Sequence, residues 1–252
     1  MGVLNGKVAL VTGAGQGVGR GIALALASEG AAIAVTGRTL NKIRETCQEI
    51  EKAGGRAYPI VCEVTSLSQI ESTVSDAVKT FGGLNILVNN AYDGAFGPLL
   101  ETSDDGFMKG LMSGPVATFR FMKVCHPHLK IGGGDIVNLA SGASQRWDAS
   151  NYGAYAVAKQ GVRALTRAGA CEWGRDGIRV NTITPLADSP ALDVWTATRP
   201  DEARQFFQTI PLGRIGSCER DIGRAVVALV GPDLRYLTGA TIPLDGGQAF
   251  FG

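Results

Sequence analysis

A tyrosine and a lysine four residues apart, Tyr155 and Lys159, form a pair in this sequence that is suited to proton transfer. If the segment that begins near Tyr152 is helical, this spacing places both side chains on one face, about 6 Å apart along the axis. Tyr152 itself lies seven residues from Lys159, so only Tyr155 is expected to feel the ammonium strongly. A free tyrosine has a pKa of about 10, and a fixed cation lowers that pKa toward neutrality. Such a phenol could give a proton to a carbonyl oxygen or take one from an alcohol.

A second polar group comes just before this pair. The predicted strand at 135–140 ends immediately before Ser141, which places the serine at the carboxyl edge of a parallel sheet. Ligands bind at that edge in open α/β sheets. Ser141 could hydrogen-bond the same carbonyl oxygen as Tyr155 and hold it in place.

Short apolar runs along the chain predict the sheet that must position these groups. They are rich in Val and Ile and apolar on both faces, as buried parallel strands are. We expect strands at 7–12, 32–36, 57–61, 84–89, 135–140, 178–183 and 241–245. Helical patterns at 17–29, 41–53 and 67–80 alternate with them. The alternation predicts an α/β fold, a Rossmann-type doubly wound parallel sheet of about seven strands with helices on both faces. With no long linker or repeat, residues 1–252 are expected to form one domain.

A glycine-rich turn, TGAGQGVGR at residues 12–20, follows the first predicted strand and opens a helix. Gly13 permits a tight turn, while Gly17 and Gly19 let the backbone approach a pyrophosphate and let the helix pack on the sheet. The helix N-terminus offers free N–H groups and a positive dipole end. In this strand–turn–helix context, the glycines predict a dinucleotide site.

The end of the second strand indicates which dinucleotide is bound. An acidic residue there would bind the ribose hydroxyls of NAD. In this sequence Gly37 stands at that position and Arg38 follows it. Glycine leaves room and a guanidinium pairs well with a phosphate, so NADP(H) is predicted in preference to NAD(H). The alternative is that Arg38 is an ordinary surface arginine.

Bulk composition excludes several classes of function. Hydrophobic residues make up 45% of the 252 residues, charged residues make up 19%, and the net charge is +1. This near-neutral balance argues against nucleic acid or a membrane surface as the partner. No apolar run reaches the length of a membrane span, and the N-terminus shows no leader pattern. Five widely spaced cysteines with no C-x-x-C motif favour a reducing, cytoplasmic setting and predict neither a disulfide framework nor a zinc site.

Taken together, the motifs resemble the short-chain dehydrogenase/reductase family along essentially the whole chain. TGAGQGVG matches the cofactor turn of that family, NNA (89–91) matches its N-N-A-G motif, and Ser141 with YAVAK (155–159) matches its catalytic serine and Y-x-x-x-K. IRVNTITP (178–185) and TGATIPLDGG (238–247) match its C-terminal strands. The resemblance implies hydride transfer between the nicotinamide and a carbonyl carbon, with Tyr155 as general acid/base and Ser141 positioning the oxygen. Lys159 would bind the nicotinamide ribose and lower the pKa of Tyr155.

The resemblance also carries over cofactor contacts and an assembly. The implied cofactor-binding residues are Gly13, Gln16, Gly17, Val18, Gly19, Arg38, Glu63, Val64, Asn90, Tyr155, Lys159 and Pro185. It further implies a homotetramer with the helices at 114–130 and 152–175 in its interfaces.

Four positions depart from the family pattern. Gly114 stands where the family has an asparagine that distorts a helix and holds a proton-relay water. Gly114-Pro115 should also distort the helix, and freed carbonyls or Ser113 could hold such a water. Tyr92, Glu63 and Leu186 replace a glycine, an aspartate and a glycine beside the expected cofactor. They reflect either neutral drift or a pocket reshaped for an unusual substrate.

Aromatic residues predict an apolar substrate pocket. The candidate walls are Tyr92, Trp147, Tyr152 and Trp195. Plain packing is the alternative for Trp147 and Tyr152. Residues 186–215 follow Pro185, hold three more prolines and form the least regular part of the sequence, which predicts a mobile substrate lid. Trp195, Phe206 and Phe207 would either line this lid or pack it down.

The function predicted is an NADP(H)-dependent oxidoreductase that interconverts a ketone and a secondary alcohol. A 3-oxoacyl-carrier-protein reductase is the alternative enzyme and would need a basic surface near the cleft, for which Arg146 is one candidate. A non-catalytic NADP-binding sensor or scaffold is the alternative of another class. No metal site is predicted, because His126 and His128 are two residues apart and do not share a helical face. Cys125 and Cys171 are expected to pack within helices.

Overall fold

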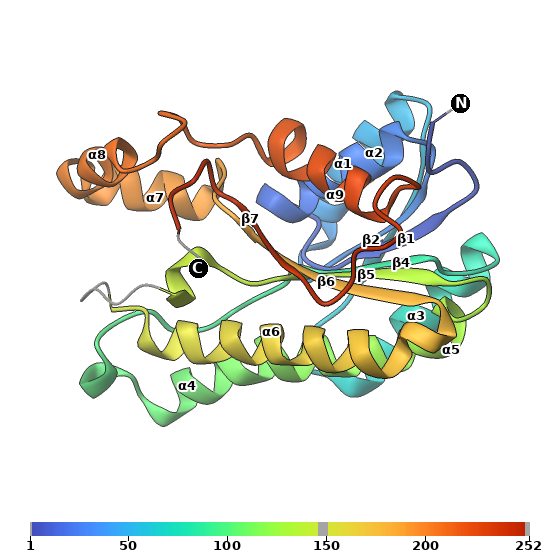
Figure 1. The fold of residues 1–252 in the computed structure, drawn as a ribbon, viewed down its shortest axis with the longest axis horizontal. Coiled ribbons are helices and arrows are strands. Elements are labelled where there is room, and N and C mark those ends of the chain that lie inside the picture. The colour runs from blue at the N-terminus through green and yellow to red at the C-terminus, as the bar shows by residue number, and fades with distance from the viewer. Residues whose placement is uncertain (1, 146–150, 250–252) are drawn as a thin grey trace.

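A computed structural model describes residues 2–145 and 151–249 of the chain. The described residues form one parallel sheet flanked by helices (Figure 1). Its strands are β1 (Val8–Val11), β2 (Ala32–Gly37), β3 (Arg56–Val61), β4 (Ile86–Asn89), β5 (Gly134–Leu139), β6 (Ile178–Pro185) and β7 (Thr241–Leu244). Its α-helices are α1 (Gly17–Ser28), α2 (Leu40–Lys52), α3 (Leu67–Phe81), α4 (Asp104–Leu111), α5 (Ala117–Leu129), α6 (Gly153–Trp173), α7 (Pro190–Thr198), α8 (Pro200–Gln208) and α9 (Arg224–Val230). The predicted Rossmann-type sheet is confirmed, and the strand boundaries differ from the sequence prediction by one or two residues.

The strand order is β3-β2-β1-β4-β5-β6-β7, and every neighbouring pair is parallel. The chain therefore winds outward from β1 in one direction as far as β3, then returns to β4 and winds in the other direction. Ligands bind beyond the carboxyl ends of the strands at such a reversal of winding. The end of β1 carries the glycine turn, and the end of β4 carries the NNA motif.

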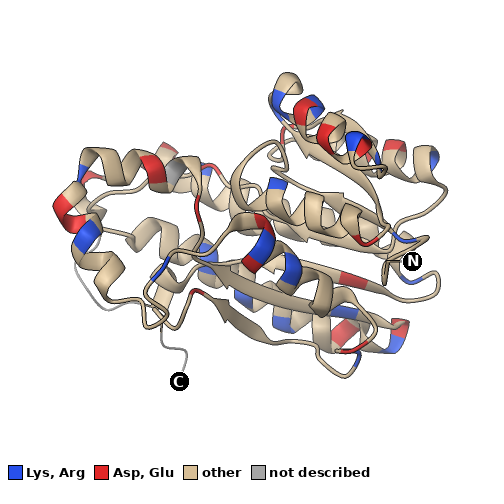
Figure 2. Ribbon diagram, turned by 90° about the horizontal axis from the view of Figure 1, so that it is seen from above, with Lys and Arg blue, Asp and Glu red and all other residues tan. Residues whose placement is uncertain are grey.

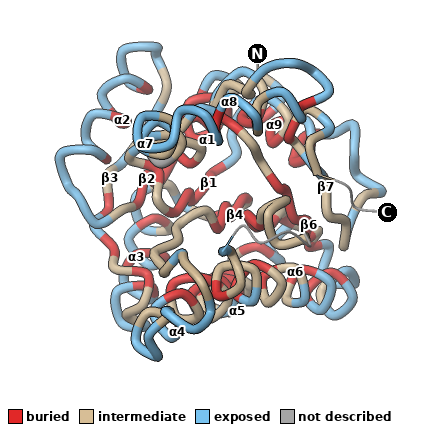
Figure 3. Tube along the Cα trace, turned by 90° about the vertical axis from the view of Figure 1, so that its left-hand side faces the viewer, coloured by how far each residue is buried: buried red, intermediate tan, exposed pale blue. Residues whose placement is uncertain are grey.

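Two hydrophobic cores lie on opposite faces of the sheet because alternate strand residues point to opposite sides. In β1, Ala9 and Val11 belong to the core beneath α1, α2 and α9, whereas Val8 and Leu10 belong to the core beneath α3 and α5. Figure 3 shows the strands as buried segments between two layers of helices whose outer faces are exposed. The central strands β1, β2 and β4 are thus covered on both faces, which explains their apolar runs, whereas the edge strands β3 and β7 are partly exposed.

The segment 186–215 is more regular than expected. It holds the two helices α7 and α8, and Pro190 and Pro200 are their first residues. Proline is tolerated at that position because the first N–H of a helix has no intrahelical partner. Two of the prolines that predicted irregularity therefore mark helix starts. In Figure 1, α7 and α8 lie at the same end of the molecule as α4 and the start of α6, on the opposite side of the sheet.

A π-helical turn, Met112–Val116, joins α4 to α5 and contains Gly114 and Pro115. Proline has no N–H to donate, and its ring crowds the preceding turn, so the regular α-helical ladder cannot continue through it. The predicted distortion at Gly114-Pro115 is therefore confirmed. The turn places Gly114 against α6, where Ala158 lies.

Charges of both signs are interspersed along the described chain (Figure 2). Within the described ranges, no helix is long and apolar enough to cross a membrane. All five cysteines are free thiols. Cys125 is fully buried, as expected for a packed cysteine, but Cys171 lies on an exposed face of α6, so its predicted packing is wrong for the single chain.

Candidate active site

The glycine-rich turn after β1 is held in place by an asparagine from β4's end. Gly13 and Gly17 have φ angles of 65° and 54°, which side-chain-bearing residues rarely adopt. The Asn90 amide donates to the carbonyl oxygens of Thr12 at 2.8 Å and Gly13 at 3.1 Å. A β-carbon at Gly19 would overlap that amide. Asn90 therefore shapes the turn, and Gly13 and Gly19 are glycines because the turn folds around it.

The N-terminus of α1 fits a pyrophosphate. Gln16 precedes the helix in an extended conformation, and the first helical turn contains no acidic residue. The Val18 side chain packs onto the core beneath the turn. No carboxylate of the first turn therefore competes for the free N–H groups at the positive end of α1. This donor set suits the phosphates of a dinucleotide.

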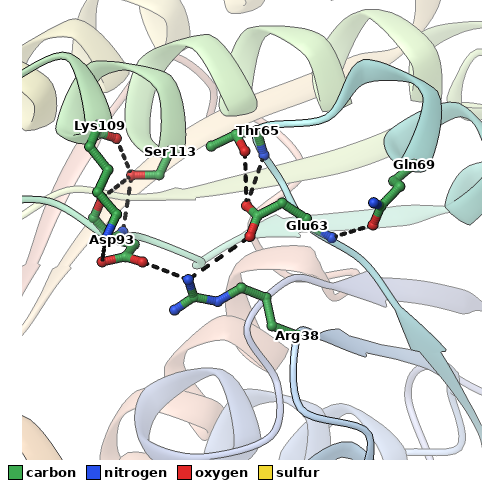
Figure 4. A network of polar contacts seen from close by, with 7 residues as sticks. All are labelled: Arg38, Glu63, Thr65, Gln69, Asp93, Lys109 and Ser113. Carbon is green, nitrogen blue, oxygen red and sulfur yellow. Dashed lines mark hydrogen bonds and ion pairs between the residues drawn. The ribbon is translucent and has the colours of Figure 1, made fainter. Parts of the chain in front are cut away.

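Arg38, the predicted phosphate ligand, lies in a network of carboxylates (Figure 4). Its Nη1 is 2.6 Å from Asp93 Oδ2 and 3.9 Å from Glu63 Oε2, and Lys109 Nζ is 3.0 Å from the other Asp93 oxygen. Burial alone would raise the pKa of Asp93, but the hydrogen bonds from Lys109 and Arg38 lower the pKa below its usual value. Glu63 also accepts hydrogen bonds from the backbone and hydroxyl of Thr65, both at 3.1 Å. Arg38 is therefore not an isolated surface arginine.

The sequence did not single out Asp93. Asp93 directly follows Tyr92 in the segment after β4. Its position at the carboxyl edge of the sheet was the available signal that it belongs to the site. The buried Val64, next to Glu63, and Pro185, at the end of β6, complete the predicted cofactor residues along this edge.

Ser141 and Tyr155 are brought together as predicted. Their side chains are hydrogen-bonded to each other, and the Ser141 hydroxyl also accepts the Ala143 N–H at 3.2 Å. Burial raises the pKa of Tyr155, and the hydrogen bond from Ser141 only partly opposes this rise. The expected lowering of the Tyr155 pKa is therefore not seen in the chain alone, because desolvation of the phenolate outweighs it.

Lys159 is a buried cation, with 5% of its surface exposed. Its Nζ donates to the Leu139 carbonyl oxygen at 2.9 Å and lies 5.6 Å from the Tyr155 ring centroid. In the described part of the chain, no carboxylate pairs with it. Burial lowers the pKa of Lys159 to about 8. Neighbouring oxygen and aromatic groups therefore accommodate this charge without an acid.

Three aromatic rings surround the phenol of Tyr155. Its ring centroid is 5.1 Å from that of Tyr92, 5.0 Å from that of Phe96 and 6.0 Å from that of Tyr152. Phe96 is 61% exposed and bridges Tyr152 and Tyr155. Sequence reasoning missed Phe96, although it follows β4 at the carboxyl edge among glycines.

Trp195, another proposed pocket wall, forms its ring contacts elsewhere. Trp195 packs edge-on against Phe206 and Phe207, with centroid distances of 5.6 Å and 6.3 Å, which ties α7 to α8. Trp147 and Arg146 lie outside the described residues. Leu186 donates its N–H to the Leu244 carbonyl oxygen, extending the pairing of β6 and β7.

Ser113 is engaged elsewhere and does not face Lys159. Its hydroxyl lies 2.7 Å from the Asp93 carbonyl oxygen and 2.8 Å from that of Lys109, and it accepts the Asp93 N–H at 3.0 Å. It thus anchors the segment after β4 to the π-helical turn. His126 forms a 2.8 Å contact with Asp176, and within the described ranges no cluster of side chains suits a metal ion.

Comparisons with known proteins agree with this geometry. Residues 13–249 match the protein family described as "Enoyl-(Acyl carrier protein) reductase". A 12α-hydroxysteroid dehydrogenase from Clostridium sp. is 40% identical over 256 residues, covering 98% of each chain. The solved structure of a 7α-hydroxysteroid dehydrogenase complexed with NADH and 7-oxo glycochenodeoxycholic acid matches with a TM-score of 0.92 at 29% identity, covering 98% of this chain and 95% of that one. A short-chain dehydrogenase from Burkholderia cenocepacia in complex with NADP matches with a TM-score of 0.89 at 30% identity, covering 97% and 98%.

The doubly wound sheet, the glycine turn and the Ser141–Tyr155–Lys159 group define an oxidoreductase of the dinucleotide-binding class. More particularly, the chain belongs to the short-chain dehydrogenase/reductase family. Both solved relatives carry a nicotinamide cofactor, which supports such a cofactor for this enzyme.

Proposed function

We propose that this enzyme interconverts a ketone and a secondary alcohol on a bulky, weakly charged molecule of the hydroxysteroid type, with NADP(H) as cofactor. The observation that carries the proposal is the ring of Tyr92, Phe96 and Tyr152 around the Ser141–Tyr155 hydrogen bond. Apolar walls with few convergent polar groups are typical of sites for such molecules. The two hydroxysteroid dehydrogenases among the relatives support this substrate class.

The chemistry proposed for the side chains follows from their positions. The substrate oxygen binds between the Ser141 hydroxyl and the Tyr155 hydroxyl, which already share a hydrogen bond. Tyr155 donates its proton to that oxygen during reduction and takes it back during oxidation. Ser141 holds the oxygen and stabilises the charge that develops on it. The Lys159 ammonium favours the phenolate left on Tyr155. A bound nicotinamide cofactor supplies or accepts the hydride.

The cofactor is proposed to lie along the carboxyl edge of the sheet. Gly13, Gln16, Gly17, Val18 and Gly19 would hold the pyrophosphate, with Glu63, Val64, Asn90 and Pro185 along the adenosine and nicotinamide. The 2′-phosphate of NADP would replace the Asp93 carboxylate as the partner of Arg38, because a phosphate carries more charge than a carboxylate. Gly37 leaves the space that an acidic side chain would fill.

We also propose a homotetramer and a cytoplasmic location. An apolar groove of about 490 Å³ between α5 and α6 supports the assembly, and Phe119 in it is 49% exposed. Five free thiols support a reducing compartment. The α7–α8 segment is the proposed lid. Interspersed surface charges (Figure 2) favour a small molecule over an acidic carrier protein.

The experiment combines purified enzyme, NADPH or NADH, and a panel of oxo-steroids, cyclic ketones and aryl ketones, with nicotinamide absorbance as readout. We expect turnover of bulky ketones with NADPH, and a loss of at least about a thousandfold in kcat for Tyr155→Phe with NADPH affinity preserved. Cofactor binding without turnover, and no difference between wild type and Tyr155→Phe, would instead support a sensor or scaffold.

A further inference from the structure

Tyr92 occupies a slot that the surrounding backbone keeps open. A β-carbon at Gly94 would overlap its hydroxyl, one at Gly110 would lie 2.9 Å from that hydroxyl, and one at Gly114 would lie 3.4 Å from the ring. Real β-carbons are almost never found closer than 3.0 Å to another heavy atom. Three glycines from two segments thus accommodate one aromatic side chain. The Tyr92 hydroxyl has no hydrogen-bond partner among the described residues.

The same ring lies against the buried Lys159. The lysine Nζ is 4.8 Å from the Tyr92 ring centroid, within the range of a cation–π contact. The ring's edge-on contact with Tyr155, at 5.1 Å, places Tyr92 beside both members of the proton-transfer pair. Gly114 and Tyr92 therefore meet in space, although each departs separately from the family pattern.

We propose that Tyr92 is a positioning residue for Lys159, and that its ring, seated on Gly114, stabilises the ammonium in place of a polar side chain at position 114. The inference rests on the proposed role of Lys159 beside Tyr155. A buried ammonium without a carboxylate loses its proton readily, and an aromatic face offsets part of that loss without neutralising the charge. The positive field then remains available to Tyr155.

Few titratable groups bear on this lysine. Tyr155 lies on its own helix, Tyr92 lies on the segment after β4, and β5 contributes only the Leu139 carbonyl. Asp93 acts on Tyr92 but is already paired with Arg38 and Lys109. Burial raises the pKa of Tyr92 to about 12, so its ring stays neutral while Lys159 titrates.

The first test compares Tyr92→Phe with Tyr92→Leu, which both lack the phenol oxygen and differ in the aromatic face. Stability is measured by denaturant unfolding at intervals from pH 6.5 to 10. Lys159 titrates near pH 8 in the folded chain and at about 10.5 when unfolded. The stabilisation by the ring should therefore be present below pH 8 and be lost as the pH rises through that value. We expect the acid dissociation constant of Lys159 to be about three- to thirtyfold larger in the leucine variant.

The second readout is turnover against pH with a ketone from the panel. Tyr92→Phe should leave the alkaline limb at its wild-type pH, whatever its rate, whereas the alkaline limb of Tyr92→Leu should move to lower pH by about half to one and a half units. Profiles that coincide for the two variants, with a stability difference that does not change with pH, would overturn the proposal. Tyr92→Met takes the place of the leucine variant if the latter does not fold. If wild type turns over no ketone, the proposed function fails, and the stability comparison still decides the role of the ring.

A double-mutant cycle tests the pairing with Gly114 independently. Gly114→Asn alone should lower the unfolding midpoint, because its β-carbon already touches the ring and Ala158. Adding Tyr92→Gly should recover stability relative to Gly114→Asn, since the amide then has the vacated slot. Strictly additive effects of the two substitutions would contradict the pairing.

Discussion

Under the proposed preference for NADP(H), replacing Arg38 with leucine should give an enzyme that no longer distinguishes the two cofactors well. The guanidinium is the basic group that follows β2, and Gly37 before it offers no competing acid for a ribose. NADH binding should change by less than about twofold, because its 2′-hydroxyl carries no charge to pair with the guanidinium of Arg38.

The expected loss of NADPH affinity in Arg38→Leu follows from two competing interactions of the guanidinium. The Arg38–Asp93 pair joins side chains that are 59% and 32% exposed, so it contributes only about 0.2–1 kcal/mol. A charge-assisted hydrogen bond to phosphate contributes about 1.5–3 kcal/mol. The difference, with a central value of about 1.5 kcal/mol, corresponds to about tenfold in Kd for NADPH. Asp93→Asn removes the competitor and should tighten NADPH binding by about two- to fivefold.

The assay is a fluorescence titration of NADPH and NADH into wild type, Arg38→Leu and Asp93→Asn. Arg44→Leu is the matched control, because Arg44 is an exposed arginine on the neighbouring helix α2. Equal losses of NADPH and NADH affinity in Arg38→Leu would refute the assignment, as would an identical loss in Arg44→Leu. Tighter NADPH binding in Asp93→Asn together with weaker binding in Arg38→Leu is the pattern that exchange of partners requires.

Two further substitutions test the pocket and the turn. Phe96→Ala should raise KM for a bulky ketone about three- to tenfold with little change in kcat, since it removes an aromatic wall and no proton donor. Steady-state kinetics measure both constants, with Tyr236→Ala as the control because Tyr236 is fully exposed. Equal KM values for Phe96→Ala and wild type would contradict the role of Phe96 as a wall. Asn90→Ala should lower the free energy of unfolding by about 1–3 kcal/mol and weaken cofactor binding, because the carbonyls of Thr12 and Gly13 lose their donor. Denaturant unfolding and NADPH titration measure both effects, and unchanged stability would show that the turn holds without Asn90.

Local patterns were sufficient to predict the sheet and the closeness of Tyr155 to Lys159. The central strands are buried on both faces, so their Val- and Ile-rich runs stand out at any register. The pairing of Tyr155 with Lys159 follows from helix periodicity alone. The distortion at Gly114 could be predicted because the effect of Pro115 on a helix is local.

Contacts between distant segments could not be predicted in this way. Tyr92 lies in a loop and Gly114 in a π-helical turn, and the two are in contact. Neither segment has a periodic sequence pattern that would indicate this contact. The pairing of Arg38 with Asp93 spans 55 residues and depends on how β2 and β4 flank β1. The two helices of 186–215 were missed because proline was taken as a helix breaker when it can also be the first residue of a helix.

Arg38 and Lys159 lie in opposite kinds of surroundings, and the difference fits their proposed tasks. Arg38 is exposed and already faces the carboxylates of Asp93 and Glu63, so its charge is balanced until a stronger anion displaces them. Lys159 is buried, and its described neighbours are a carbonyl oxygen and two aromatic rings. A carboxylate beside it would hold the proton firmly and cancel the field at Tyr155. An aromatic partner stabilises the ammonium less but leaves that field intact, so a setting without a carboxylate among its described neighbours suits the role proposed for Lys159.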